Sequence, residues 1–88
     1  MDLSAVDRVE INEAFAPQAL ACVRELGLDL ATTNIHGGAI ALGHPLGASG
    51  SRITMHLAHA IARGDVSTAV GSACIGGGQG IALVLRKA

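Results

Sequence analysis

The chain has 88 residues, enough for one small domain, and half of them are apolar although only one, Phe15, is aromatic. Its net charge is −1 and 15% of its residues are charged, which excludes the basic, aromatic-rich surface typical of nucleic-acid binding. No apolar run approaches a membrane span, and the first residues do not resemble a signal peptide, so we expect no membrane contact and a cytoplasmic location. The two cysteines, Cys22 and Cys74, are far apart, which is typical of a reducing compartment rather than of a disulfide framework.

The first part of the chain predicts a strand followed by a helix. Residues 6–12 alternate apolar and charged side chains, as a half-buried strand ending at Asn12 does. Residues 13–26 place apolar side chains at helical spacing. Pro17 fits the first turn of this helix, and Gly27 is a suitable stop.

The second part predicts one long helix and two further strands. Residues 34–42 are apolar and broken by glycine, so they predict a buried strand or a tight loop. Residues 47–63 predict a helix closed by Gly64, and residues 67–75 and 80–86 predict strands around a glycine-rich turn. The continuous apolar run of the last strand is typical of a central strand. The order of elements predicts an α/β fold: a layered mixed β-sheet with helices packed on it, whose apolar strands need cover from more protein.

Asn12 stands at the predicted strand-to-helix junction. A polar residue just before a helix is usually an N-cap, and that interpretation is the commoner one for the junction alone. The functional interpretation is an amide side chain that points into the crevice beyond the carboxyl end of the strand, where the sites of α/β proteins tend to lie.

His44 lies in the glycine-rich segment 37–50, between Gly43 and Pro45. A lone histidine is more often structural, even in a loop. A histidine held rigidly between glycine and proline at the entry of a helix suits a general base, or a hydrogen-bond donor to a developing oxyanion.

Cys74 follows a β-rich run and precedes the three glycines 76–78. An isolated cysteine is usually a small buried apolar side chain. Beside glycines it can instead be a reactive thiol with exposed backbone N–H groups nearby. Cys22 lies inside the first predicted helix, and we interpret it as a packing residue.

Other ligand sites find little support in the sequence. The glycine runs match neither a phosphate-binding loop nor the dinucleotide-binding fingerprint. The histidines and Cys74 offer donors for zinc, but no paired short spacing supports a metal site. We therefore expect neither a metal nor a separate cofactor.

Three segments, in this order and spacing, resemble the thiolase family. They are NEAF at 12–15, GGAIALGHPLGASG at 37–50 and CIGGGQG at 74–80. The likeness covers nearly the whole chain. The related ketoacyl synthases share a glycine-and-histidine segment but use a second catalytic histidine where this chain has Cys74.

The resemblance implies that residues 1–88 form the C-terminal half of a thiolase, truncated on its N-terminal side. It implies acyl transfer between coenzyme A thioesters: reversible thiolysis of a 3-ketoacyl-CoA, or Claisen condensation of acetyl-CoA. Thiolases react through an acyl-cysteine, and the nucleophilic cysteine belongs to an N-terminal domain that this chain lacks. The isolated segment is therefore expected to be inactive.

The resemblance also implies a role for four residues. His44 matches the histidine that activates the nucleophile and helps hold the first oxyanion. Asn12 matches the asparagine that positions a water in the same oxyanion hole. Cys74 matches the second cysteine, which deprotonates the α-carbon for condensation or protonates the leaving enolate during cleavage. Gly76 matches the backbone N–H of the second oxyanion hole.

The implied partners are an acyl-CoA substrate and either an N-terminal thiolase half or another thiolase subunit, with a homo-oligomer as the complete enzyme. The alternative is a non-catalytic, thiolase-like assembly or binding module, which the missing nucleophile favours. A small metal-binding domain is a third and weaker hypothesis.

Overall fold

The computed structural model describes all 88 residues as a three-stranded mixed sheet flanked by helices. In chain order the elements are a short 3-10 helix Leu3–Ala5 (η1), strand β1 (Arg8–Ile11), helices α1 (Ala16–Leu26), α2 (Ala39–Leu42) and α3 (Ser49–Arg63), and strands β2 (Thr68–Ile75) and β3 (Gln79–Arg86). This arrangement confirms the predicted α/β fold. None of the helices combines the length and the hydropathy that crossing a membrane would require.

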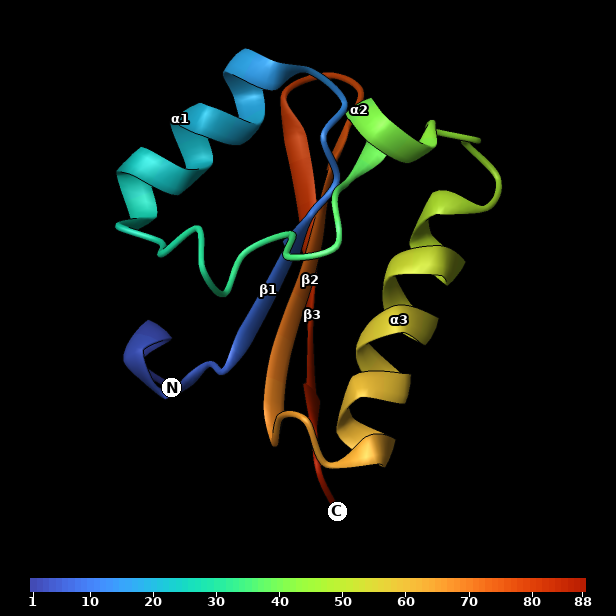
Figure 1. Cartoon of the computed structure of the whole chain (residues 1–88). Helices are drawn as coiled ribbons and strands as arrows, with labels where there is room; N and C mark the ends of the chain where they lie inside the picture. The colour runs from blue at the N-terminus through green and yellow to red at the C-terminus, as the bar shows by residue number, and fades with distance from the viewer.

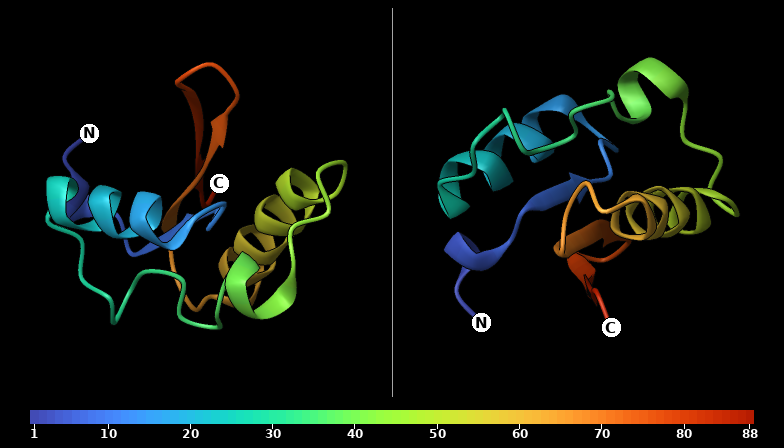
Figure 2. Two further views of the ribbon diagram at one scale, coloured as in Figure 1. Left: turned by 90° about the horizontal axis from the view of Figure 1, so that it is seen from above. Right: turned by 60° about the horizontal axis from the view of Figure 1, so that its bottom comes forward.

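The strand order is β1-β2-β3, with β1 parallel and β3 antiparallel to β2. In the register, Ile11 lies opposite Ser72, and Cys74 lies opposite Gly80. The sheet is seen nearly edge-on in Figure 1, and the view from above in Figure 2 places α1 and α3 on opposite sides of it. The fold is therefore layered, with one long helix on each face.

The prediction that the last strand is central was wrong, because β2 is the central strand and β3 lies at the edge. The apolar run of β3 packs only in part. Leu83 and Leu85 are half-buried, with Leu85 against the core under α3, whereas Ile81 is 63% and Val84 is 52% exposed. A continuous apolar run indicates cover on both faces of a strand, and within these 88 residues that cover is incomplete.

The ends of the long helices follow the predicted glycines. Gly27 and Gly64 both adopt left-handed conformations, with φ of 61° and 81°, and end α1 and α3. The predicted start of α1 at residue 13 was three residues early, because Phe15 is the N-cap and Pro17 stands in the first turn. Asn12 is thus not the cap of this helix, and the commoner interpretation of the junction was wrong.

The segment predicted as a buried strand or tight loop, residues 34–42, ends in the one-turn helix α2. Just before it, Thr33 forms a single bridge to Val9, and Asn34 adopts a positive φ of 48°. The Asn34 side chain accepts from the Ile11 N–H at 2.8 Å and donates to the Ile11 carbonyl at 2.9 Å. The Asn34 side-chain amide therefore makes the two hydrogen bonds to Ile11 that the backbone of a neighbouring strand would make, so both backbone groups of Ile11 have partners.

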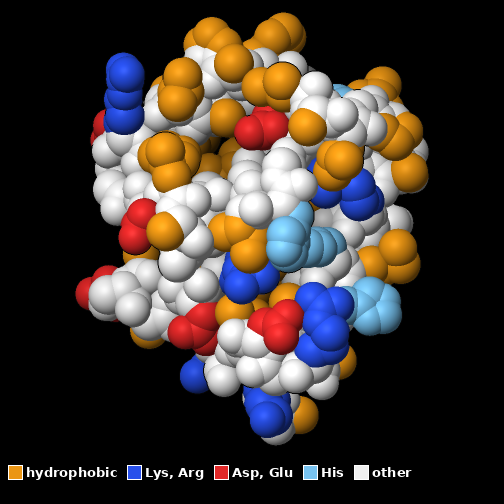
Figure 3. Space-filling model, in the orientation of Figure 1, with side chains coloured by type: hydrophobic (Ala, Val, Ile, Leu, Met, Phe, Trp, Pro, Cys, Tyr) orange, Lys and Arg blue, Asp and Glu red, His pale blue; other side chains and the backbone are white.

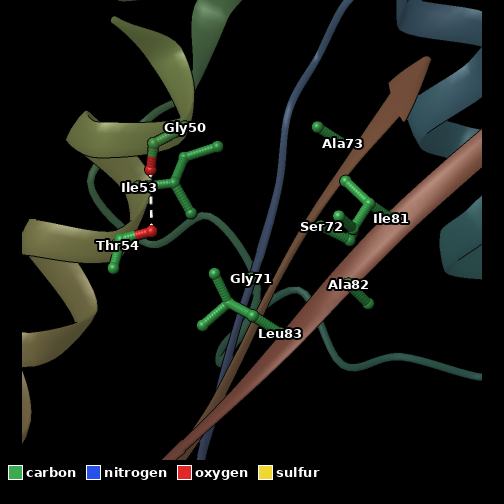
Figure 4. A pocket seen from close by; sticks show the side chains of 9 residues that line it. All are labelled: Gly50, Ile53, Thr54, Gly71, Ser72, Ala73, Ile81, Ala82 and Leu83. Atoms are coloured by element: carbon green, nitrogen blue, oxygen red, sulfur yellow. Dashed lines mark hydrogen bonds between the residues drawn. The ribbon is translucent and has the colours of Figure 1, made fainter.

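The core lies between α3 and the sheet. Ile53, Leu57 and Ala69 form a buried cluster, and Gly71 lets the helix approach β2 closely. Figure 4 shows the cavity of about 220 Å³ that begins beyond this cluster, between the first turns of α3 and the β2–β3 ladder. Its lining is mostly apolar, and Thr54 bends back to donate to the Gly50 carbonyl at 2.8 Å.

Exposed apolar side chains gather at one end of the molecule. In Figure 3 they crowd the upper end, where α1, α2 and the β2–β3 turn lie, and the charged side chains are more numerous below. The large exposed ones on this end include Phe15, Ile40, Leu42, Leu46 and Ile75. Both chain termini lie toward the lower end (Figure 1).

The close approach at Gly71 generates a stability prediction. A Cβ at Gly71 would lie 2.9 Å from Ile53 Cγ2, so Gly71→Val should lower the free energy of unfolding of the chain by about 1–3 kcal/mol through overpacking. Gly80→Val is the matched control, because it stands on the partner strand and its Cβ would meet only a carbonyl oxygen at 3.7 Å. Urea unfolding followed by circular dichroism measures both, and equal stabilities would contradict the packing described here.

Candidate active site

The three segments singled out in the sequence lie at one end of the sheet. β1 and β2 are parallel, so their carboxyl ends point the same way, toward the upper end of Figure 1. The Asn12 N–H donates to the Ser72 carbonyl at 2.8 Å, which brings the end of β1 within two residues of Cys74 along β2. His44 arrives from the loop between α2 and α3 at the same end. This is the edge where the sites of α/β sheets lie.

Asn12 is 1% exposed, and its side chain lies against His44 instead of capping a helix. Its amide Nδ2 lies 3.4 Å from the imidazole Nε2 of His44. Its other polar atom, Oδ1, is buried and has no partner within the chain. A buried amide oxygen of this kind needs a donor, and a water or a ligand at the site can supply one.

Ser49, which the sequence analysis missed, holds His44 from the opposite side. The Ser49 Oγ lies 2.6 Å from His44 Nδ1 and donates its only proton to the Pro45 carbonyl at 3.1 Å. With its proton on the Pro45 carbonyl, the hydroxyl accepts at its oxygen, and this geometry suits the tautomer in which His44 Nδ1 carries the hydrogen and donates to Ser49. Ser49 is 3% exposed and begins α3, which fixes its position.

The tautomer that follows leaves a lone pair on His44 Nε2. The neutral ring therefore accepts the long hydrogen bond from Asn12, and the same lone pair can take a proton from an incoming group. His44 itself is exposed, so a group from outside this chain can reach it. The arrangement is that of a general base oriented by a second side chain.

Cys74 lies at the same end, as an exposed free thiol near the tip of β2. It makes no hydrogen bond to Asn12 or His44. The turn that follows contains Gly77 and Gly78 with positive φ of 79° and 73°, a conformation that other residues rarely adopt. The Gly76 N–H donates to no backbone carbonyl of the chain and is exposed, so it is free to bind an oxygen of a ligand. Cys22, by contrast, is half-buried inside α1, as a packing residue should be.

Glu13, also missed in the sequence, fastens α2 to the end of β1. Its Oε1 accepts from the Ile40 N–H at 3.3 Å, and its side chain lies so close to Gly38 that a Cβ there would overlap the carboxylate. The glycine pair that opens the His44 segment is thus required in part by this contact. Only the spacing of the segment was visible in the sequence.

A second polar group lies beside the site, between β1 and α3. Glu10 is 1% exposed, and its Oε1 lies 3.4 Å from His56 Nε2. Burial raises the pKa of Glu10, against the opposing effect of Arg52 and Arg8. Burial also lowers the pKa of His56, and the charge of nearby His36 adds to that effect. Both groups therefore favour their uncharged forms relative to free solution.

No three or more histidine, cysteine or acidic side chains are grouped closely enough to hold a metal ion. His36 and His56 do meet, edge to face, with ring centroids 5.3 Å apart.

A proton-accepting histidine, an exposed thiol and a glycine-rich turn with a free N–H therefore lie at one end of the sheet, and acyl-transfer chemistry uses groups of these kinds. The family described as "Thiolase, C-terminal domain" matches residues 1–87. The chain belongs to the thiolase family.

The relatives are alike in sequence and in structure. The chain is 63% identical over 87 residues to human mitochondrial 3-ketoacyl-CoA thiolase, an alignment that covers 99% of this chain and 22% of the relative. It is 54% identical over 85 residues to an acetyl-CoA acetyltransferase of Pseudomonas aeruginosa, an alignment that covers 97% of this chain and 22% of that relative. The crystal structure of the human enzyme in complex with CoA superposes with a TM-score of 0.95 at 61% identity, over 100% of this chain and 22% of that one. The chain thus spans about a fifth of the length of the curated relatives it matches, and the thiolase-like fold expected from the resemblance is confirmed.

The contact between Ser49 and His44 predicts the effect of Ser49→Ala. Without the hydroxyl, Nδ1 loses its acceptor, so the neutral ring of His44 should redistribute toward the Nε2–H tautomer. The ¹⁵N shifts of the ring in the labelled 88-residue chain report the tautomer directly. Ser51→Ala, two residues along the same helix and exposed, is the control and should leave the ring unchanged. A His44 ring that keeps its Nδ1–H without Ser49 would contradict the proton assignment.

The lowered pKa of His56 predicts an acid-sensitive stability. Because the folded-state pKa lies below the ordinary value of 6.5, protonation favours the unfolded chain, and the free energy of unfolding should fall as the pH drops through 6.5. Glu10 contributes with the opposite sign, since its raised pKa favours the folded state as the pH falls toward 4.5.

A comparison of variants separates these two contributions. His56→Gln should lose less stability than the wild type between about pH 8 and about pH 6, because the titrating group is gone while Glu10 remains. His59→Gln, on the same helix with an exposed ring, should keep the dependence of the wild type. Chemical denaturation at the two pH values is the measurement, and identical curves for His56→Gln and the wild type would refute the assignment.

Proposed function

We propose that this chain supplies the acid–base and oxyanion-binding part of a thiolase active site, for acyl transfer between coenzyme A thioesters. The observation that carries the proposal is the hydrogen-bonded series Asn12–His44–Ser49, which leaves a proton-accepting Nε2 at the end of the sheet. The presence of Cys74 and Gly76 at the same end supports it. Named relatives include 3-ketoacyl-CoA thiolases and acetyl-CoA acetyltransferases, and the human enzyme has been crystallised with CoA.

In the cleavage direction, His44 Nε2 takes the proton of a cysteine thiol that a second polypeptide segment provides. The resulting thiolate attacks the 3-keto carbon of the substrate, and the Cα–Cβ bond breaks to leave an acyl-cysteine and the enolate of acetyl-CoA. The Cys74 thiol gives its proton to that enolate carbon. Coenzyme A then gives its thiol proton to the Cys74 thiolate and attacks the acyl-cysteine. The displaced cysteine thiolate takes its proton back from His44, and the shortened acyl-CoA is released.

Two oxygens develop negative charge in these steps: the former 3-keto oxygen and the thioester oxygen of the enolate. Each has hydrogen-bond donors in the proposed mechanism. A water bound to the unpaired Oδ1 of Asn12 donates its other hydrogen to the first oxyanion, together with protonated His44. The free Gly76 N–H donates to the thioester oxygen of the enolate. The partner is thus a thiolase N-terminal half or another thiolase subunit, and the complete enzyme is a homo-oligomer. A cytoplasmic location remains our prediction from the sequence, although several relatives are described as mitochondrial.

A chimera tests the proposal. The 87 matched residues of this chain replace the corresponding segment of human mitochondrial 3-ketoacyl-CoA thiolase, and thiolysis of acetoacetyl-CoA is followed by loss of the substrate absorbance. The chimera should be active, and His44→Ala or Cys74→Ala should each lower kcat by roughly 100-fold or more, because each removes an acid–base group. The isolated chain should show no activity.

The chain offers a matched control for both substitutions. Cys22→Ala removes a half-buried cysteine of α1, and His59→Ala removes an exposed histidine of α3, so both should retain the kcat of the chimera. Near-normal turnover in the Cys74→Ala chimera would refute the role of Cys74. Activity of the isolated chain would show that a nucleophile lies within these 88 residues.

The alternative function is a non-catalytic assembly module, and the exposed apolar surface of β3 and of the upper end of the molecule favours it. In that case the isolated chain should pair with itself or with another thiolase-like chain. Size-exclusion chromatography at several concentrations tests this, and a folded chain that remains strictly monomeric counts against the alternative.

A further inference from the structure

A row of polar side chains fills the contact between β1 and α3. Glu10 and Asn12 are two residues apart on the strand and share its α3 side. Ser49, Arg52 and His56 recur at helical spacing along one side of α3. Asn12 meets the His44–Ser49 pair at one end of the row, and Glu10 meets His56 at the other.

The same helix contacts β2 quite differently. There the contact is apolar and consists of Ile53 and Leu57 against Ala69, without hydrogen bonds between the side chains. Polar contacts are directional, and buried ones are best known for fixing the register of two elements. The position of α3 relative to β1, and with it the distance from Asn12 to His44, therefore depends on the polar row.

Glu10 is the buried acidic side chain of this row. The groups that face it are Arg8 on β1, Arg52 and His56 on α3, and Glu13 beyond the strand, with His36 edge to face against His56. A cavity of about 150 Å³ is lined by several of these side chains. Three buried atoms of its lining have no hydrogen-bond partner: Glu10 Oε1, Arg52 Nε and His56 Nε2.

This cavity contains three unpartnered polar atoms and is large enough for a few ordered waters, which would join these atoms into one network. Its lining also includes Gly37 and Leu42, the segment that leads directly into Gly43 and His44. The network thus contacts the strand that carries Asn12, the helix that begins with Ser49, and the segment that carries His44.

We infer that Glu10 is a positioning residue: through Arg52, His56 and the cavity that the three side chains line, it holds β1 against α3 and so aligns Asn12 with His44. A carboxylate in this place costs stability relative to a well-packed apolar residue, because its burial removes it from water. Its contribution is to alignment. The expected effect of Glu10 on catalysis rests on the proposed function. The expected effect of Glu10 on the alignment of Asn12 with His44 rests on the geometry alone.

The structural consequence is tested on the 88-residue chain itself. Glu10→Gln keeps the shape of the side chain and removes its charge. The Asn12 side-chain amide and the His44 ring resonances should both shift in NMR spectra of the variant, while the ring of the distant, exposed His59 should not. Glu25→Gln, an exposed residue of α1, is the matched control and should leave all three unchanged. Unshifted Asn12 and His44 resonances in a folded Glu10→Gln chain would overturn the inference, whether or not the chimera is active.

The catalytic consequence is tested in the chimera. Glu10→Gln should lower kcat between about tenfold and 100-fold with little change in KM, since the catalytic pair is misaligned while substrate contacts are unaffected. The effect should be largely absent in an Asn12→Ala background, because the residue that Glu10 aligns is then gone. Arg52→Gln removes the positive charge that acts on Glu10 from the helix side and should behave alike.

Additive losses in the double variant, accompanied by a lower thermal midpoint, would mean that Glu10 serves only the fold and would overturn the inference. The same holds if Glu10→Gln retains the kcat of an active chimera. An inactive parent chimera would refute the proposed function, and the NMR comparison then decides on Glu10 alone.

Discussion

The parallel pairing of β1 with β2 is the constraint on which the rest of this structure depends. Its four rungs join residues about 60 positions apart, from Arg8 opposite Ala69 to Ile11 opposite Ser72. Parallel neighbours need a crossover connection, and here the crossover contains α1, α2 and α3. Because the two strands end side by side, a residue at the end of β1 and a residue at the end of β2 reach the same edge of the sheet.

α3 has two different contacts with that sheet: an apolar contact with β2, which stabilises the fold, and a polar contact with β1, which we propose aligns the site. Its apolar side packs on β2 through Ile53 and Leu57, which form a buried cluster with Ala69. Its polar side faces β1 through Ser49, Arg52 and His56. The first turn of the same helix orients His44, so a single element connects the core of the domain to the proton-accepting atom of the site.

Local patterns were sufficient to predict most elements and the place of the site. The helical periodicity of residues 47–63 and the glycine after it predicted α3 to within two residues, because an amphipathic helix carries its own signal. Asn12, His44 and Cys74 were found because their glycine and proline neighbours are unusual and because the three motifs occur together. Their roles in catalysis remain predictions.

What escaped prediction depends on contacts between distant segments. Ser49 and Glu10 carry no local signal: one resembles an ordinary residue at a helix start, the other the charged half of an alternating strand. Their importance appears only when α3 lies on β1. The edge position of β3 was missed for a similar reason, since apolar composition does not reveal which neighbours a strand has.

The placement of the termini has a practical consequence. Both chain ends lie toward the end of the molecule opposite the Asn12–His44 pair, and the longest dimension of the domain is 34 Å. A fluorophore, an affinity tag or a surface tether attached at either end is therefore held away from the edge at the carboxyl ends of β1 and β2. The domain can be immobilised or labelled through its termini while the edge that carries His44 and Cys74 stays open to solvent.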